Sequence, residues 1–332
     1  MTEKFMADSF KPFNNHFKGK SFISIDQLTS VAEIRKIFKE ARRMEKIVLK
    51  KKPSNLLKGY CIAELFYQPS TRTFTSFLAA AEWLGALTIP IHGMSSYSSV
   101  VKGETIEDTV RSVHQTTAAD LIVMRHPDND STEIAAKYSY VPIVSGGAGT
   151  KEHPTQAILD LYTIEKELGR TKNLKVIFLG DLKYGRTIKS LGKLLTLMDK
   201  KLQLYLVSPK ILKMPEELVH EWRGKGVKIV ETDDLQKVLP EADVLYVTRI
   251  QKEWFEKEGK LDQYEKVKHA FDINLKTLKK AKKKMIIMHP LPRVGEIAYE
   301  VDDDPRAVYL PQMRAGLYTR MALMKLILLG DK

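Results

Sequence analysis

Short apolar runs alternate with amphipathic segments along almost the whole chain, and this alternation limits the possible folds. It is typical of parallel strands joined by crossover helices, with helices on both faces of the sheet. In the first half we expect an amphipathic helix at 31–50 and then strands at 60–66, 86–92, 120–125 and 141–145. The expected helices between these strands are 73–84, 104–116 and about 131–138. Residues 1–20 show no periodicity, and we expect a loose arm there.

A second alternation begins where His153-Pro154 starts a helix that extends to about residue 168. Its expected strands are 174–179, 202–207, 227–231, 244–248 and 285–289, and its expected helices are 186–198, 216–224, 233–239 and 275–282. The pattern does not assign the apolar helix at 317–329 to either half. We therefore predict an α/β protein with two doubly wound parallel-sheet domains. Ligands of such sheets bind beyond the carboxyl ends of the strands, so the expected active site is a cleft between the domains.

Size and composition agree with this architecture. At 332 residues and 37.9 kDa the chain exceeds one ordinary core, and 43% hydrophobic with 29% charged residues excludes a disordered protein. No apolar run approaches the length of a membrane span, and residues 1–20 lack a signal-peptide core. We therefore expect a cytoplasmic protein without a membrane partner. Cys61 is the only cysteine, which excludes an internal disulfide bond and a multi-cysteine zinc site.

The formal net charge of +13 raises the question of a nucleic-acid partner. The lysines are dispersed apart from the runs 50–52 and 279–284, and no aromatic stacking pattern accompanies them. Solvated helix faces explain those runs more simply, and a positive field would also favour anionic substrates. We therefore expect no nucleic acid among the partners.

The stretch Phe66–Leu78 concentrates polar groups where a helix begins. Ser70-Thr71-Arg72-Thr73 follows an apolar strand and a Gln-Pro break, and apolar residues at helical spacing come next. Free backbone N–H groups, the positive end of the helix dipole and a guanidinium suit a phosphate group. On local evidence alone, an ordinary Ser/Thr N-cap with a solvated arginine explains the stretch equally well.

Pro-Ser-Thr-Arg-Thr after a strand resembles the carbamoyl phosphate loop of the aspartate and ornithine carbamoyltransferase family. The resemblance recurs, in the same order, at 101–109, 124–127, 153–164, 180–187, 248–253 and 289–297. It implies that residues 1–153 bind carbamoyl phosphate, with the C-terminal helix 316–332 packing back on them, and that residues 154–315 bind L-aspartate. Thr155 follows the aspartate-specific form of the motif, where ornithine enzymes carry cysteine.

The resemblance assigns the carbamoyl phosphate site to residues of the first domain. His153 would donate to the carbamoyl oxygen, as a donor placed where charge develops. His126 is expected to be structural. The implied binding residues are Ser70, Thr71, Arg72, Thr73, Arg125, His153, Gln156, Ser98 and Lys102, and the implied catalytic residues are Arg72, Thr73, His153 and Lys102.

The aspartate site would come from the second domain. Arg186 would bind one carboxylate, and Arg249 with Gln251 would hold the other, facing one side if the chain there is extended. The carbonyl of Leu291, between two prolines, would face the substrate nitrogen, and Lys102 would also contact aspartate. The segment 180–187 lacks the glycine pattern of a dinucleotide site. The reaction that the resemblance implies needs neither a metal nor an organic cofactor, so none is expected.

In the family, the loop with Ser98 and Lys102 crosses from a neighbouring subunit of a homotrimer to complete the site. Without the family, a solvated loop explains these residues. A regulatory chain or a fused or associated pathway enzyme is neither indicated nor excluded.

The chain departs from the common family pattern at Phe74, Leu78, Val101, Gly295 and Ala315, which bears on affinity and domain closure. The implied reaction transfers the carbamoyl group from carbamoyl phosphate to L-aspartate, giving N-carbamoyl-L-aspartate and phosphate for pyrimidine biosynthesis. A carbamoyltransferase for another amine and an inactive structural member of the family remain as alternatives.

Overall fold

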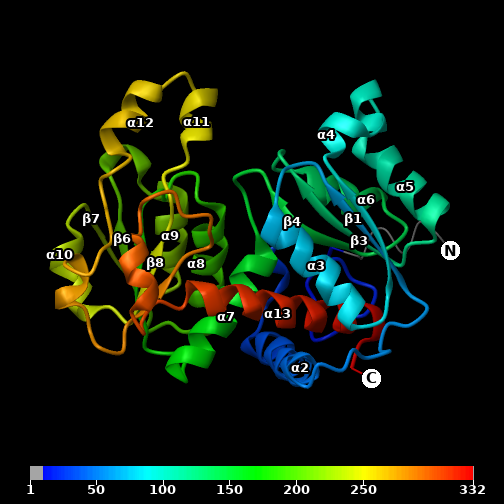
Figure 1. Cartoon of the computed structure of the whole chain (residues 1–332), viewed down its shortest axis with the longest axis horizontal. Helices are drawn as coiled ribbons and strands as arrows, with labels where there is room; N and C mark the ends of the chain where they lie inside the picture. Colours follow the sequence, from blue (N-terminus) through cyan, green and yellow to red (C-terminus); the bar gives the residue numbers. More distant parts are fainter. Residues whose placement is uncertain (1–9, 332) are drawn as a thin grey trace. The chain divides into compact units, whose positions relative to one another are not determined.

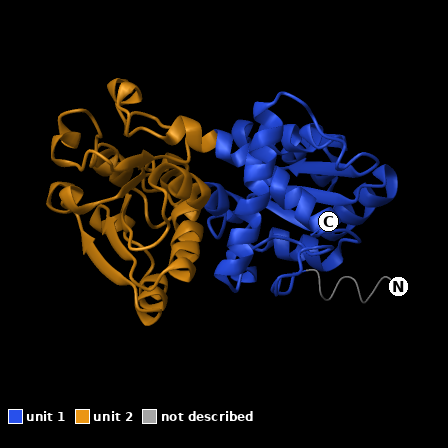
Figure 2. Cartoon of the chain, turned by 90° about the horizontal axis from the view of Figure 1, so that it is seen from below, with its two compact units in different colours: residues 1–159, 314–332 blue, residues 160–313 orange. Residues whose placement is uncertain are grey.

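The computed structural model describes residues 10–331, which form two compact units. Unit 1 comprises residues up to 159 together with 314–332, and unit 2 comprises 160–313 (Figure 2). Because the unit boundaries lie at 159/160 and 313/314, the chain leaves unit 1 within helix α7 (Pro154–Leu168) and returns within helix α13 (Tyr309–Leu329). The boundaries expected from the sequence are 153/154 and 315/316.

Unit 1 is built on a four-stranded parallel sheet in the order β2-β1-β3-β4. The strands are β1 (Cys61–Phe66), β2 (Leu87–His92), β3 (Leu121–His126) and β4 (Ile143–Ala148). Strand β1 is buried throughout, as expected for a strand with neighbours on both sides, whereas β2 at the edge leaves Leu87 66% exposed. The longer helices of the unit are α2 (Val31–Leu49), α3 (Thr71–Trp83), α5 (Ile106–Thr117) and α6 (Ser131–Tyr138) (Figure 1).

Unit 2 is built on a five-stranded parallel sheet in the order β7-β6-β5-β8-β9. The strands are β5 (Lys175–Leu179), β6 (Gln203–Val207), β7 (Lys228–Thr232), β8 (Val244–Val247) and β9 (Ile286–Met288). The helices are α8 (Arg186–Met198), α9 (Glu216–Gly224), α10 (Leu235–Val238), α11 (Lys252–Lys257) and α12 (Leu261–Val267). The two doubly wound parallel-sheet units confirm the predicted fold class.

The expected elements differ from the observed ones mainly where helices are short. The expected helix at 275–282 is a single 3-10 turn, η5 (Thr277–Lys280). The expected helix at 233–239 ends at Val238 and passes into the 3-10 turn η4 (Leu239–Glu241), where Pro240 has no N–H to continue an α-helical ladder. The last helix begins at Tyr309 instead of Leu317. Its charged side chains Arg320 and Lys325, only 3% and 1% exposed, interrupt its apolar pattern.

The prediction of a loose arm at the N-terminus is wrong for residues 10–20, and residues 1–9 lie outside the described residues. Phe13 and Phe17 are 0% and 1% exposed, and their rings stack at 4.3 Å. The Gly19 N–H donates to Ile327 O at 2.8 Å, which ties this segment to α13. Periodicity fails here because the segment buries aromatic rings without regular structure. Within residues 10–331, no helix is both long and apolar enough to cross a membrane.

Candidate active site

The expected phosphate-binding residues lie at the start of α3, directly beyond the carboxyl end of β1. The helix begins at Thr71, with Ser70 as its N-cap, two residues earlier than expected. The side chain of Ser70 makes no capping hydrogen bond. This removes the main support for an ordinary N-cap, because the hydroxyl is not used to satisfy the helix. Thr71 is exposed, Arg72 is half-buried, and Thr73 is 7% exposed.

Arg125 lies at the same edge of the sheet. It pairs in register with Phe66 of β1, and its Nη1 donates to Gly146 O of β4 at 3.2 Å. Strand pairing therefore places Arg125 at the carboxyl edge of the sheet, next to the end of β1, the strand that α3 follows. His126 ends β3, one residue later than expected. Its Nδ1 accepts the Asp128 N–H at 3.1 Å, its ring packs on Tyr67 at 4.3 Å, and burial lowers its pKa. These contacts agree with a structural role.

His153 and Gln156 enter the site from the segment between β4 and α7. His153 is 3% exposed, and its carbonyl accepts the N–H of Gln156 at 3.0 Å. Ahead of it, Ala148 N–H donates to Glu152 O at 3.1 Å, so the chain turns back directly after β4. The helix of Gln156 starts at Pro154, where a proline loses no hydrogen bond.

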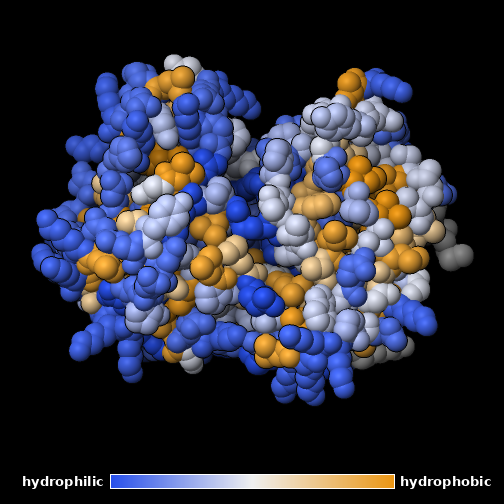
Figure 3. Space-filling model, in the orientation of Figure 1, coloured by the Kyte–Doolittle hydropathy of each residue, from blue (hydrophilic) through white to orange (hydrophobic). Residues whose placement is uncertain are grey.

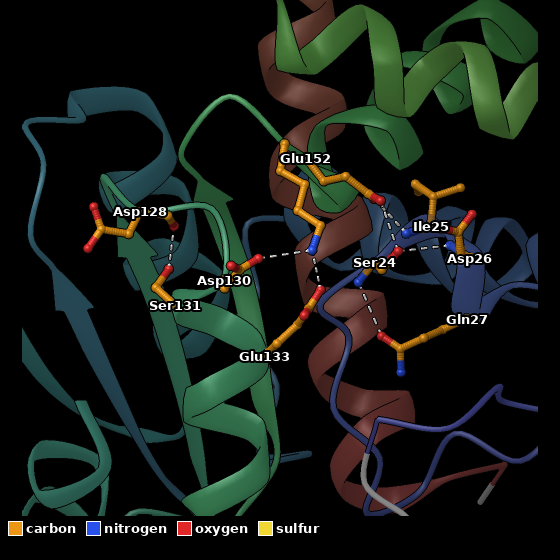
Figure 4. A network of polar contacts seen from close by, with 10 residues as sticks. Ser24, Ile25, Asp26, Gln27, Asp128, Asp130, Ser131, Glu133 and Glu152 are labelled. Atoms are coloured by element: carbon orange, nitrogen blue, oxygen red, sulfur yellow. Dashed lines mark hydrogen bonds and ion pairs between the residues drawn. The ribbon is translucent and has the colours of Figure 1, made fainter. Parts of the chain in front are cut away.

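A polar network fixes the residues just before His153 (Figure 4). The Glu152 carboxylate accepts the Ser24 hydroxyl at 3.0 Å and the Ile25 N–H at 2.9 Å. Lys151 Nζ binds Asp130 at 3.3 Å and Glu133 at 2.5 Å, at the start of α6. The sequence analysis did not single out Glu152. Its only signal was an acidic residue next to the histidine of the motif.

The segment expected as a loop contains two short helical turns, α4 (Met94–Tyr97) and η2 (Ser99–Lys102). Ser98 connects the two turns, and Lys102 ends the second. The Ser98 hydroxyl donates to Met94 O at 2.7 Å and accepts the Val100 N–H at 3.3 Å. Lys102 is exposed. The neighbouring Tyr97 and Val101 are 90% and 62% exposed, and Figure 3 shows an apolar group among mostly neutral and polar surface at the upper tip of unit 1.

In unit 2, Arg186 is the first residue of α8, after a tight turn that follows β5. The turn needs Gly180, whose φ is +111° and whose added Cβ would lie 2.2 Å from Thr248 O. Arg186 is half-buried, and burial lowers its pKa to about 10. It therefore remains a cation at neutral pH.

Asp181 organises this turn and connects it to the end of β8. Its Oδ1 accepts the Tyr184 N–H at 2.9 Å, and its Oδ2 accepts Gln251 Nε2 at 3.3 Å. Burial raises the pKa of Asp181 to about 6, while the hydrogen bonds from Tyr184 and Gln251 act in the opposite direction. The sequence analysis missed this residue. An aspartate directly after a strand-ending glycine was the available signal, since Asp favours such turns.

Arg249 and Gln251 follow β8 but do not lie on a strand. The side chains are expected to face one side only if this segment is extended, and it does not continue the strand. Gln251 is the N-cap of α11 and turns to Asp181. Arg249 Nη1 donates to Glu253 Oε2 at 2.9 Å, and Nη2 donates to Oε1. Burial acts to lower the pKa of Arg249, but the Glu253 carboxylate raises it overall. Glu253 is a second residue that the sequence analysis missed.

Leu291 lies in a loop whose backbone is held from both sides. Its φ is +56°, the left-handed region, which is costly for a leucine and often marks a functional site. The Leu291 N–H donates to His289 Nδ1 at 2.7 Å. His289 Nε2 contacts Glu296 Oε1 at 2.7 Å, and the His289 N–H donates to Gln312 Oε1 at 3.0 Å. These hydrogen bonds fix the backbone of the loop.

The structure thus brings the predicted residues together as two sets, each within one unit. In unit 1, Ser70–Thr73 follow β1, Arg125 lies near the end of β3, and His153 and Gln156 follow β4, so all lie at the carboxyl ends of parallel strands. In unit 2, the ends of β5 and β8 bring Arg186 and Gln251 to one edge. Among residues 10–331, no group of three or more His, Cys, Asp or Glu side chains is placed to hold a metal ion.

Two family models match the chain, one in each half. Residues 20–166 match the aspartate/ornithine carbamoyltransferase carbamoyl-P binding domain, and residues 172–327 match the aspartate/ornithine carbamoyltransferase Asp/Orn binding domain.

Individual relatives match over almost the full length. The aspartate carbamoyltransferase catalytic subunit of Thermococcus onnurineus is 45% identical over 312 residues, covering 94% of this chain and 98% of the relative. The crystal structure of Trypanosoma cruzi aspartate transcarbamoylase in complex with carbamoyl phosphate and aspartate superimposes with a TM-score of 0.87 at 40% identity, covering 94% of this chain and 98% of that one. Multifunctional protein pyr-3 of Neurospora crassa is 46% identical over 315 residues, covering 95% of this chain but 17% of that protein.

Proposed function

The chain belongs to the aspartate/ornithine carbamoyltransferase family, and we propose that it transfers the carbamoyl group of carbamoyl phosphate to the amine of L-aspartate. The products are N-carbamoyl-L-aspartate and phosphate, as in pyrimidine biosynthesis. The observation that carries the proposal is the distribution of the candidate binding groups over the two halves of the chain. An anion-binding helix start with Arg125 lies in the half that matches the carbamoyl-P binding domain, and two arginines lie in the half that matches the Asp/Orn binding domain.

Carbamoyl phosphate binds first in this proposal. Its phosphate accepts hydrogen bonds from the α3 start at Ser70–Thr73 and from Arg125, and the helix dipole favours its negative charge. His153 and Arg72 donate to the carbamoyl oxygen, and Gln156 contacts the carbamoyl group. Donors fixed where the oxygen becomes negative stabilise the tetrahedral transition state most. The contacts around Glu152 support this role, because they immobilise the backbone that carries His153.

L-Aspartate binds next, with one carboxylate on Arg186 and the other on Arg249 and Gln251. Two guanidinium groups favour a dicarboxylate over ornithine, whose second charge is positive. The carbonyl of Leu291 accepts a hydrogen bond from the amine and directs its lone pair to the carbamoyl carbon. The new N–C bond forms as the C–O bond to phosphate breaks, and phosphate leaves with the amine proton. Orientation and electrostatics account for the rate enhancement.

We further propose that the sites are shared in a homotrimer. The exposed Lys102 and the exposed Tyr97 and Val101 on the same two turns support this, because apolar side chains so far into solvent suit a subunit contact. Lys102 of one subunit then completes the carbamoyl phosphate site of its neighbour, together with Ser98. We also retain a cytoplasmic location as part of this proposal.

A colorimetric assay for carbamoyl aspartate tests the reaction directly. The purified chain should form product only with both carbamoyl phosphate and L-aspartate. Ornithine and L-asparagine, each tested by release of phosphate, should react far more slowly. An Arg72→Ala variant prepared in the same way controls for contaminating activity. Faster phosphate release with ornithine than with aspartate would assign the chain to the other branch of the family.

A further inference from the structure

Arg320 of α13 contacts α3 from inside unit 1. Its side chain is 3% exposed, and its Nη1 donates to Ser76 Oγ at 2.7 Å. Its guanidinium carbon also lies 4.8 Å from the centre of the Phe77 ring. The two helices lie side by side in unit 1 (Figure 1). A fully buried cation therefore contacts the second turn of the helix whose first turn is the candidate phosphate site.

Ser76 passes this contact on to the first turn of α3. Its Oγ donates to Thr73 O at 3.0 Å. A serine hydroxyl has one proton and two lone pairs, so it can donate to the carbonyl while it accepts from the arginine. A charged donor on the hydroxyl polarises it and strengthens its bond to the carbonyl. The chain of contacts therefore runs from Arg320 through Ser76 to Thr73, which is itself 7% exposed.

Close packing holds the guanidinium in this place. A Cβ at Gly316, one turn before Arg320, would lie 2.6 Å from Arg320 Nη1 and 3.1 Å from Leu159 Cδ2. The glycine leaves the space that the guanidinium fills. Because protein interiors are densely packed, a group held this way has few alternative positions.

The carboxyl group of Glu64, on strand β1, interacts with the charge of Arg320. Glu64 of β1 is wholly buried, and neither carboxylate oxygen has a hydrogen-bond partner. Burial raises its pKa to about 8, although the charge of Arg320 acts in the opposite direction. Glu64 is therefore mostly protonated at pH 7.

We propose that Arg320 is a positioning residue for phosphate binding, which acts through Ser76 to hold the first turn of α3 in its anion-binding conformation. The inference rests on the proposed function, because it assigns that turn to carbamoyl phosphate. The physical reason is geometric. The N–H groups at a helix start bind one anion only when they point to the same place, so a small change in the first turn weakens all of them together.

Three variants and one matched control test the proposal. Ser76→Ala removes the connecting hydroxyl, Arg320→Met removes the charge, and the double variant combines them. Lys325→Met is the control, because Lys325 is equally buried on α13 but binds Gly330 O at 3.0 Å and lies 3.7 Å from Glu40. The measurements are the dissociation constant for inorganic phosphate by calorimetry, the thermal midpoint, and separate KM values for carbamoyl phosphate and aspartate.

Ser76→Ala and Arg320→Met should each weaken phosphate binding about tenfold, the loss expected for a charge-assisted hydrogen bond. The double variant should lose no more phosphate affinity than the more strongly affected single variant, because both changes break the same chain of contacts. KM should rise for carbamoyl phosphate and not for aspartate at saturating carbamoyl phosphate. Arg320→Lys, which retains a donor, should restore most of the affinity. Lys325→Met should lower the thermal midpoint while phosphate binding stays at the wild-type level.

Wild-type phosphate affinity in Ser76→Ala would overturn the inference, as would additive losses in the double variant or an equal loss in Lys325→Met. If Arg320→Met does not fold, Ser76→Ala and Arg320→Lys decide the question. The phosphate titration contains no aspartate and needs no turnover. A wild-type chain that binds phosphate but forms no carbamoyl aspartate would therefore contradict the proposed function and leave this inference in place.

Discussion

Arg249 donates through both Nη atoms to Glu253, and this pairing determines how it can serve a substrate. A guanidinium has five N–H donors, and the pair engages two of them. The remaining donors can bind a carboxylate while Glu253 fixes the direction of the fork. Such preorganisation lowers the entropy cost of binding. We therefore expect Arg249 to bind the substrate carboxylate in a fixed direction, and not to act as a mobile surface charge.

Replacing Arg249 with alanine should consequently damage the use of aspartate alone. Losing one partner of a charged hydrogen-bonded pair costs about 2–5 kcal/mol, so kcat/KM for aspartate should fall by about 30- to 5,000-fold. The dissociation constant for inorganic phosphate, measured on the same preparation, should stay at the wild-type value. Arg223→Ala is the matched control, because Arg223 also pairs with a glutamate, Glu231, at 3.2 Å. An equal loss of phosphate binding would mean that Arg249 is structural.

Glu64 gives unit 1 a pH dependence that can be isolated by one substitution. Burial raises its folded-state pKa from 4.5 to about 8, against the charge of Arg320. Below pH 4.5 both the folded and the unfolded state bind the proton, and stability is not affected. Between pH 4.5 and 8 the unfolded state loses the proton while the folded state keeps it, so stability falls as pH rises.

The Glu64→Gln variant should lack this loss. Its free energy of unfolding relative to wild type should increase steadily from pH 5 to pH 8, by an amount on the order of a few kcal/mol. Urea unfolding of both proteins at several pH values measures the difference, in which the other titrating groups cancel. A constant difference across this range would show that Glu64 is ionised in the folded protein.

The residues that sequence reasoning found and missed differ in a physical way. Arg72, Arg125, His153 and Arg186 stand at ends of strands or starts of helices, which pattern and motif both locate. Asp181, Glu152 and Glu253 act through contacts with other side chains, and sequence spacing does not reveal these partners. The roles of all the site residues in substrate binding stay predictions.

At the scale of elements, the ends of the paired parallel strands β5 and β8 show why one glycine matters for the proposed aspartate site. Thr248 Oγ1 donates to Leu179 O at 3.1 Å and accepts the Asp181 N–H at 3.1 Å. The two strand ends are thereby joined across Gly180. The backbone approach leaves no room for a side chain, because a Cβ at Gly180 would lie 2.2 Å from Thr248 O.

Gly180→Ala should therefore destabilise unit 2 by about 2–4 kcal/mol, through overpacking and an unfavourable positive φ. Aspartate binding should weaken as well, because the strand ends carry Arg186 and Gln251. Gly224→Ala serves as the control, since Gly224 ends α9 and nothing lies within 4 Å of its added Cβ. That change should be neutral or stabilising by up to about 1 kcal/mol. Urea unfolding compares the two, and equal stabilities would refute the packing argument.

Buried strands and long helices were predicted from the sequence because their apolar periodicity is set by the core. Strand β1 and helices α6 and α8 agree closely with the expected ranges. Short elements could not be predicted, because tertiary contacts decide them. Helix α11, for example, places Trp254 against Tyr184 with ring centres 5.9 Å apart, a contact between segments distant in sequence. Residues 10–20 fold for the same reason, through Phe13 and Phe17.

For the whole molecule, the proposed reaction requires that carbamoyl phosphate, assigned to unit 1, and aspartate, assigned to unit 2, react together. In the proposal, Lys102 of one subunit completes the active site of a neighbouring subunit, and this part of the proposal depends on the formation of a homotrimer. In a closed ring of three, each subunit lends its turns to one neighbour and borrows from the other. A chain with a damaged pocket can then still complete the site of its neighbour.

Mixing two inactive variants tests this sharing. A Lys102→Ala chain retains the His153 pocket, and a His153→Ala chain retains the visiting lysine, yet each homotrimer contains only damaged sites. Unfolding and refolding an equal mixture should pair a sound pocket with a sound lysine in about one quarter of sites, the product of two independent halves. Activity should therefore recover to about a quarter of the wild-type value.

Each variant refolded alone in the same way gives the background activity, and mass spectrometry confirms that the mixture contains mixed trimers. If Lys102 serves its own chain, no combination contains an intact site. Mixed trimers with background activity would then exclude the shared site while leaving the roles of His153 and Lys102 in the reaction open to direct measurement.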